Sequence, residues 1–208
     1  SDEFFNDYLP YTIELGRSFV QPKYQKGRYA RKGLFALDNL WDGLGAITIE
    51  YPDVKYFFGK VTMYKHFDVE ARNTLLSFMH LYFPDKDNLI ITPTQIDVDF
   101  AKYQKQFKGN DYKADYKLLG SVLKESGERI PPLINTYMNI SPSMRTFGTI
   151  ENPYFGGVEE TGILISIDDI YAAKKDRHII TYKRMAKFKS LVKSKLKIKR
   201  IRKKKRDK

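Results

Sequence analysis

The chain of 208 residues lacks cysteine, and this absence excludes disulfide bonds, thiolate metal sites and a cysteine nucleophile. Histidine is also scarce. His66, His80 and His178 show no spacing typical of metal ligands, so we expect no bound metal. No hydrophobic run approaches the roughly 20 residues that a membrane-spanning helix needs. Walker and G-x-G-x-x-G motifs are absent as well, which argues against the nucleotide-binding folds built on them.

Positive charge is distributed unevenly along the chain. Residues 174–208 contain 18 Lys and Arg against two acidic residues, whereas residues 1–173 contain 19 against 23. The net charge of +12 is therefore a property of the tail, and the body is slightly acidic. A hydrophobic content of 42% is typical of a folded protein. We expect a folded domain over residues 1–173 and a basic tail over 174–208.

The tail has the pattern of a basic amphipathic helix. Met185, Phe188 and Val192 fall on one helical face among lysines. Such helices bind anionic membrane surfaces, where each Lys or Arg contributes about 1 kcal/mol. Residues 185–208 are therefore expected to contact an anionic membrane. A solvated terminus is the bland alternative, and nucleic acid would bind the same charges by counterion release. The acidic body, however, offers no basic groove of the kind that a nucleic-acid module shows.

Hydrophobic periodicity predicts a mixed α/β domain. Alternation predicts a strand over residues 11–20, which Pro22 ends because proline has no amide to donate. Helix periodicity begins at Leu34, and Asp68 is a candidate cap for a second helix. Prolines at 131–132 suit the first turn of another. The further predicted strands are residues 56–64, 144–149 and 161–167, and a helix is predicted over 112–126.

Between the first predicted strand and the first predicted helix, residues 21–33 form a cationic segment with two glycines. A strand that leads through such a loop into a helix N-terminus makes an anion site, because free amides, the helix dipole and nearby cations add up. A phosphate, a diphosphate or a phosphopantetheine would fit there. Basic surface loops are common, so this pattern alone does not identify the ligand.

The segment from Glu14 to Val20, with Pro22 and residues 24–25 after it, resembles the fourth strand and acyl-carrier loop of the GNAT superfamily. The resemblance is to its long-chain branch, the bacterial ornithine-lipid and glycine-lipid N-acyltransferases often labelled "hemolysin-like". Residues 34–44 are similar to the following helix, residues 56–64 to the fifth strand, and residues 131–133, Tyr137 and 155–156 to the carboxyl-terminal portion. The usual Q/R-x-x-G-x-G/A loop is altered, because residues 25–27 are one residue short and the next glycine is Gly33.

The resemblance implies an α/β (α+β) fold with a GNAT-like mixed sheet flanked by helices. A GNAT domain has three strands and two helices before its fourth strand, whereas about ten residues precede that strand here. Domain 1–173 is therefore expected to be partial and to lack the amino-terminal strands. We expect the missing half on a longer parent or on a partner chain, since the strand around Glu14 would otherwise keep an unpaired edge.

The resemblance also implies a reaction, the transfer of a long acyl group from acyl carrier protein or coenzyme A to a small amino acid in aminolipid synthesis. The acyl-phosphopantetheine donor is then a substrate, and no cofactor stays bound. Glu14 is a candidate general base, with Arg17 orienting it or the acceptor's carboxylate, and Tyr64 is a candidate proton donor to the thiolate. The thioester and its phosphates are expected at Ser18, Phe19, Val20, Lys26, Gly27, Arg28, Arg31, Lys32 and Gly33.

Other interpretations stay open at the level of sequence. Glu14 and Arg17 lie on opposite faces of a regular strand, so a bulge or separate roles would be required, and a purely structural ion pair is the alternative. Acyl-homoserine-lactone synthases share a strand with this Glu and Arg spacing, which makes a signal synthase a second candidate. A non-catalytic membrane- or nucleic-acid-binding module with a degenerate GNAT half is the third. The expected location is the cytoplasm, peripheral on the inner face of the membrane.

Overall fold

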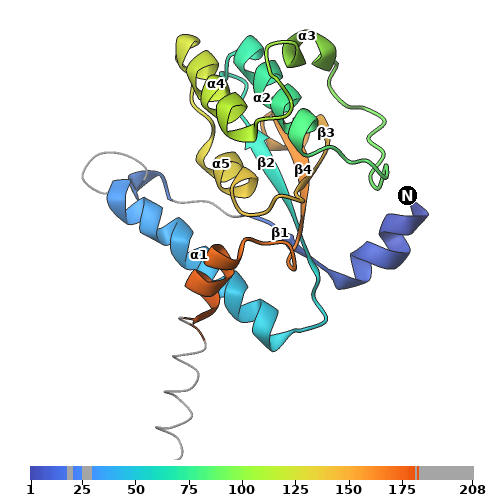
Figure 1. The fold of residues 1–208 in the computed structure, drawn as a ribbon, viewed down its shortest axis with the longest axis vertical. Helices are drawn as coiled ribbons and strands as arrows, with labels where there is room; N and C mark the ends of the chain where they lie inside the picture. Colours follow the sequence, from blue (N-terminus) through green and yellow to red (C-terminus); the bar gives the residue numbers. More distant parts are fainter. Residues whose placement is uncertain (18–20, 25–29, 181, 183–208) are drawn as a thin grey trace, which may run out of the picture. The chain divides into compact units, whose positions relative to one another are not determined.

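The computed structural model describes residues 1–17, 21–24, 30–180 and 182, without the side chains of residues 30–34 and 36–38 (Figure 1). The described residues fall into two compact units. The first combines residues 1–17 with 53–171, and the second takes the described residues of 18–52 and 172–208. The division at residue 173, expected from the charge distribution, stays a prediction. Within the described ranges, none of the helices is both long enough and apolar enough to span a bilayer.

A four-stranded mixed sheet forms the centre of the first unit. Its strands are β1 (Thr12–Leu15), β2 (Tyr56–Met63), β3 (Arg145–Asn152) and β4 (Val158–Ser166), in the spatial order β1-β2-β4-β3. β1 runs parallel to β2, and the other two pairings are antiparallel. β1 pairs with β2 only from Tyr56 to Gly59, so the second half of β2 continues without β1 beside it. The sheet and its flanking helices confirm the expected mixed α/β fold class.

Helices cover one face of this sheet: α2 (Val69–Tyr82), α4 (Tyr112–Glu125) and α5 (Pro132–Met138), with the short α3 (Phe100–Gln104) beside α2 (Figure 1). Phe57, Val61 and Ile163 point into this layer and are at most 2% exposed. Asp68 caps α2 as predicted, since its carboxylate accepts a hydrogen bond of 2.9 Å from the amide of Ala71. The helices and strands predicted from periodicity are therefore confirmed here, with ends shifted by a few residues.

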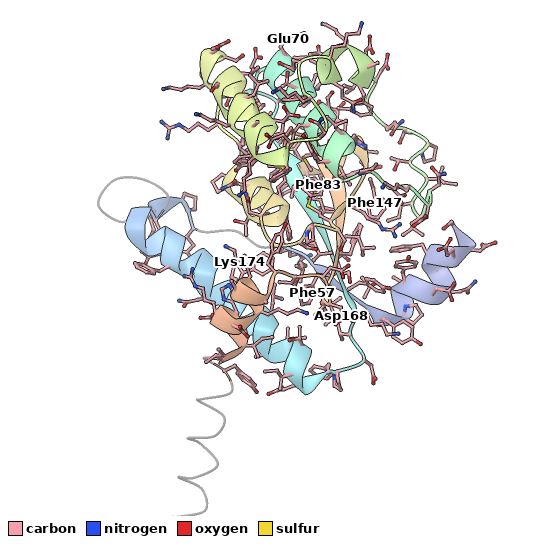
Figure 2. The ribbon with its side chains drawn as sticks, in the orientation of Figure 1. Phe57, Glu70, Phe83, Phe147, Asp168 and Lys174 are labelled. Carbon is pink, nitrogen blue, oxygen red and sulfur yellow. The ribbon has the colours of Figure 1, made fainter. Side chains whose placement is uncertain are left out.

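The opposite face of the sheet is covered in part by the amino-terminal segment, whose helical residues are Phe4–Tyr8 and Leu9–Tyr11. Phe4 and Tyr8 pack against a buried cluster of Leu89, Phe147 and Leu164. Figure 2 shows Phe147 on the side of the sheet that faces this segment. Sequence periodicity did not predict this helical segment, which contributes Phe4 and Tyr8 to the hydrophobic cover of the second face.

The second unit is built on α1 (Ala30–Glu50) and a helical segment over residues 172–180. His178 is buried and its Nδ1 lies 2.7 Å from a carboxylate oxygen of Asp42 on α1. The two helices meet closely at Gly45, where a Cβ would lie 3.2 Å from the backbone of His178. Glycine at this position therefore permits the close packing. The predicted membrane-binding segment, residues 185–208, lies outside the described residues.

Two predicted boundaries are wrong. The first strand was expected over residues 11–20, but β1 ends at Leu15 and Arg17 has a left-handed backbone with φ 58°. A non-glycine residue in that conformation ends the pleat, and the amino-acid pattern carries no sign of it. The cationic loop was expected to reach residue 33, but α1 already begins at Ala30. Arg31, Lys32 and Gly33 therefore belong to the first turn of the helix rather than to the loop.

Candidate active site

Three charged side chains gather on the second face of the sheet, where β1 ends. Glu14 of β1 pairs in register with Phe58, and Lys60 lies on the same face two residues farther along β2. The Nζ atom of Lys60 is 3.9 Å from Oε1 of Glu14 and 3.9 Å from Oε2 of Glu160 on β4. Lys60 is opposite Gly162 in the register, so its partner on β4 has no side chain to crowd it. We call Glu14, Lys60 and Glu160 the charged cluster.

The three members of the charged cluster differ in burial. The side chain of Glu160 is 12% exposed, that of Lys60 is 47% exposed and that of Glu14 is 60% exposed. Asn152 of β3 donates a hydrogen bond of 3.0 Å to Glu160, which fixes the buried carboxylate. Both distances to Lys60 exceed hydrogen-bond length, so these ion pairs are loose. The cluster therefore runs from a fixed inner carboxylate to an outer one that a reactant can reach.

Arg17 does not share the strand with Glu14. The alternation of β1 stops at Leu15, and Arg17 lies in the left-handed turn that follows. The three-residue spacing would put Glu14 and Arg17 on opposite faces of a regular strand. That argument does not apply here, because Arg17 is not part of the strand. A role for Arg17 in orienting Glu14 or a substrate stays a prediction.

Tyr64 lies at the far end of β2. It follows Met63, stacks on His66 with the ring centroids 5.7 Å apart, and is 59% exposed. Five residues of extended chain separate it from Gly59, the last residue of β2 that pairs with β1, which corresponds to about 16 Å. The structure thus does not bring Tyr64 together with Glu14.

Most of the residues expected to bind the acyl donor lie outside the described part of the chain. Ser18, Phe19, Val20, Lys26, Gly27 and Arg28 lie outside the described residues. Arg31, Lys32 and Gly33 are described as backbone in the first turn of α1, in the second unit. Their assignment to the thioester and phosphates stays a prediction.

A buried tyrosine on the helix-covered face of the same strand pair was given no role by sequence reasoning. The hydroxyl of Tyr137 on α5 packs on Gly59, where a Cβ would come within 2.8 Å of it and within 3.8 Å of Leu15. Burial raises the pKa of Tyr137 to about 12, so the hydroxyl stays protonated near neutral pH. Gly59 inside an apolar strand was the available signal, since such glycines mark a close approach of another group. Lys60 and Glu160 were missed as well, because their meeting depends on strand register.

Among the described residues, a second candidate active site could be either a pocket or a metal-binding cluster. A hollow of about 550 Å³ opens between α2, α3 and α4, lined by Glu70, Thr74, Tyr103 and Val122 among others. Among the predicted site residues whose side chains the structure describes, Glu14, Arg17 and Tyr64 do not line it. Across the part of the chain that the structure describes, no group of three or more His, Cys, Asp or Glu residues is arranged to hold a metal ion.

Comparison with known proteins points to acyl transfer. Two curated relatives share 50% identity with this chain over 184 residues, which is 88% of its length. Both are named glycine N(alpha)-acyltransferase, one from Phocaeicola vulgatus and one from Bacteroides thetaiotaomicron. The chain spans about half the length of these relatives, 56% and 55%. No family model and no solved structure matches. The similarity supports the expected relation to acyltransferases.

Proposed function

We propose that this chain forms part of an N-acyltransferase that transfers an acyl group from a thioester to the amine of a small amino acid, with glycine as the first candidate. The observation that carries the proposal is the 50% identity, over 88% of the chain, to proteins named glycine N(alpha)-acyltransferase. The charged cluster supports it, because it places an exposed carboxylate, Glu14, at the end of a strand that the resemblance assigns to the thioester site.

The proposed reaction needs one base and one carbonyl-binding group. Glu14 accepts a proton from the ammonium of the amino acid, and the freed amine attacks the thioester carbonyl. The carbon–sulfur bond breaks as the amide forms, and the thiolate leaves and takes up a proton. Backbone amides of residues 18–20 would stabilise the oxyanion, and the cations of residues 26–33 would hold the donor's phosphates. Such a reaction requires that the amine and the thioester be held in a fixed relative orientation.

The proposal also covers the acyl donor and the location of the enzyme in the cell. A long-chain acyl group carried by acyl carrier protein or coenzyme A would give an amphiphilic N-acyl amino acid, as in aminolipid synthesis. Residues 185–208 would then hold the enzyme at the cytoplasmic face of an anionic membrane. The edge of β1 that faces away from β2 pairs with no strand among the described residues. We propose that the remainder of the transferase, on the same or a partner chain, covers this edge.

Turnover by the full-length protein tests the proposed function. Acyl carrier protein loaded with a long-chain acyl group and long-chain acyl-coenzyme A are each supplied with glycine, ornithine or S-adenosylmethionine, and the products are identified by mass spectrometry. An N-acyl amino acid is expected. An N-acyl-homoserine lactone from S-adenosylmethionine would instead indicate the signal synthase, and the absence of any acylated product would contradict the proposal and favour a binding module.

Vesicle flotation tests the membrane assignment separately. The full-length protein should float with vesicles that contain anionic lipid, and deletion of residues 185–208 should abolish flotation at physiological salt. Vesicles of phosphatidylcholine alone serve as the control, since basic segments gain their binding from anionic headgroups. Equal flotation with and without the segment would contradict a membrane role for the tail.

A further inference from the structure

We infer that the charged cluster is the acceptor site for a zwitterionic amino acid, in which Lys60 binds the acceptor's carboxylate and Glu14 receives its ammonium group. The inference rests on the proposed function and adds to it the chemical class of the acceptor and the residue that selects it. Sequence reasoning placed no role on Lys60, which lies inside an otherwise apolar strand.

The geometry of the pair suits insertion of a molecule that carries both charges. Glu14 and Lys60 face each other at 3.9 Å, outside hydrogen-bond distance, and both side chains are about half exposed. This gap is too short to hold an amino acid, so the two exposed side chains must swing apart to admit one. The acceptor then offers its ammonium to the carboxylate and its carboxylate to the ammonium. Neither side chain then loses a partner, and the net charge of the site is unchanged. An amine without a carboxylate would draw Glu14 away from Lys60 and offer Lys60 no carboxylate in exchange, so Lys60 would keep Glu160 alone and binding would be weaker.

Glu160 makes this insertion feasible because it gives Lys60 a second, permanent partner. Its side chain is 12% exposed and accepts a hydrogen bond of 3.0 Å from Asn152, so it cannot leave when the acceptor arrives. Lys60 therefore stays near the sheet after Glu14 has turned to the substrate. Glycine presents no side chain to recognise, so a site for it must use these two charged ends.

Lys65 provides a contrast on the same segment of chain. Its Nζ lies 3.1 Å from Oε1 of Glu151, within hydrogen-bond distance, and the side chains are 64% and 56% exposed. It also packs against Gly157 at the turn between β3 and β4. This is an ordinary surface ion pair away from the end of β1, and replacing it should not alter acceptor choice.

The test compares glycine with glycinamide, which keeps the amine and lacks the carboxylate. Steady-state kinetics of the full-length protein are measured with both acceptors for the wild type, Lys60→Met, Lys60→Arg and the control Lys65→Met. The wild type should prefer glycine. Lys60→Met should raise KM for glycine roughly 10- to 100-fold and leave turnover of glycinamide nearly unchanged. Lys60→Arg should recover part of the preference, and Lys65→Met should match the wild type.

The outcomes separate this inference from the function on which it rests. If the wild type acylates neither acceptor, the proposed function fails. If it acylates both equally well, or if Lys60→Met keeps the wild-type preference for glycine, the transferase stands and the acceptor site is wrong. Melting temperatures are recorded in parallel, and loss of folding in Lys60→Met together with an unchanged preference in folded Lys60→Arg and Lys60→Gln would assign Lys60 a structural role and overturn the inference.

Discussion

The two faces of the sheet in the first unit differ in what covers them and in what they expose. On the helix-covered face, Phe57, Val61 and Ile163 are nearly inaccessible, with exposures of 0–2%. On the other face, an aromatic cluster around Phe147 gives way to the half-exposed charges of Glu14 and Lys60. Successive side chains of a strand point to opposite faces, so one step along β2 leads from the charged Lys60 to the buried Val61. The proposed acceptor site therefore lies on the face that also keeps half-exposed charges.

This difference also separates two carboxylates that look alike in the sequence. Asp115 is buried among the helices, where Tyr82 donates to it at 2.6 Å and the amide of Gly109 at 2.8 Å. Glu14 is 60% exposed and meets one loose cation. A carboxylate whose hydrogen bonds are already satisfied holds structure together, whereas an exposed one can accept a substrate's proton.

The largest expected effect on stability comes from the helix-covered face. Phe57→Ala should lower the free energy of unfolding by about 3–5 kcal/mol, because it opens a cavity in a core that is 2% exposed at this point. Urea denaturation followed by circular dichroism measures the change. A loss below about 1 kcal/mol would show that this face is not the main source of stability.

Glu14→Gln should lower activity and leave stability nearly unchanged. As the loss of a general base, it is expected to reduce kcat at least about 100-fold, with the melting temperature within a degree or two of wild type, because the side chain is exposed. Glu151→Gln, another exposed carboxylate paired with a lysine, is the matched control and should keep full activity. Parallel losses of activity and stability in Glu14→Gln would make Glu14 structural.

Asp115→Asn tests the structural carboxylate through pH. Burial alone would raise the pKa of Asp115, but the hydrogen bonds from Tyr82 and from the amide of Gly109 outweigh it and hold the pKa below its usual value. A lowered pKa in the folded state stabilises the protein above the unfolded pKa of about 4, and this contribution is lost as pH falls. The variant should lose roughly 1.5–3 kcal/mol at pH 7.

The difference between Asp115→Asn and wild type should shrink in urea denaturation performed below about pH 4. Glu125→Gln at the end of the same helix, α4, is exposed and serves as the control with little change at either pH. A difference that is equally large at pH 3 and pH 7 would contradict the assignment, because it would not arise from ionisation of Asp115.

Gly59→Ala is expected to have the smallest effect of the four. The new Cβ would stand 2.8 Å from the hydroxyl of Tyr137, so the buried ring must shift, at a cost of about 1–2 kcal/mol in the free energy of unfolding. Gly120→Ala in α4 has nothing within 4 Å of its new Cβ and should stabilise the helix by up to about 1 kcal/mol. Equal changes in both variants would show that Tyr137 does not depend on the glycine.

Long periodic segments account for the part of the fold that the sequence predicts. β2, α2 and α4 follow from regular hydrophobic spacing, and Asp68 marks the start of α2 by its capping chemistry. The amino-terminal helix was missed because Phe4, Phe5 and Tyr8 show no extended period. The early end of β1 depends on the backbone conformation of Arg17, which residue type does not indicate.

The candidate site was predictable only where chemistry lies within one segment. Glu14 was named as a candidate from a local strand motif, whereas Lys60 and Glu160 come from strands 100 residues apart whose register must be known first. Tyr137 was one isolated position of the family resemblance and carried no assigned role. Its contact with Gly59 follows from packing of α5 on the sheet. Tertiary proximity of this kind leaves little trace in a single sequence.

The most direct test of the two-face account is amide chemical-shift mapping of the isotopically labelled full-length protein titrated with glycine, with donor thiol present. The account predicts that shifts concentrate on the residues around Glu14, Lys60 and Glu160 and that Lys60→Met removes them. Shifts that appear instead around the hollow at Tyr103, or that persist unchanged in Lys60→Met, would contradict it.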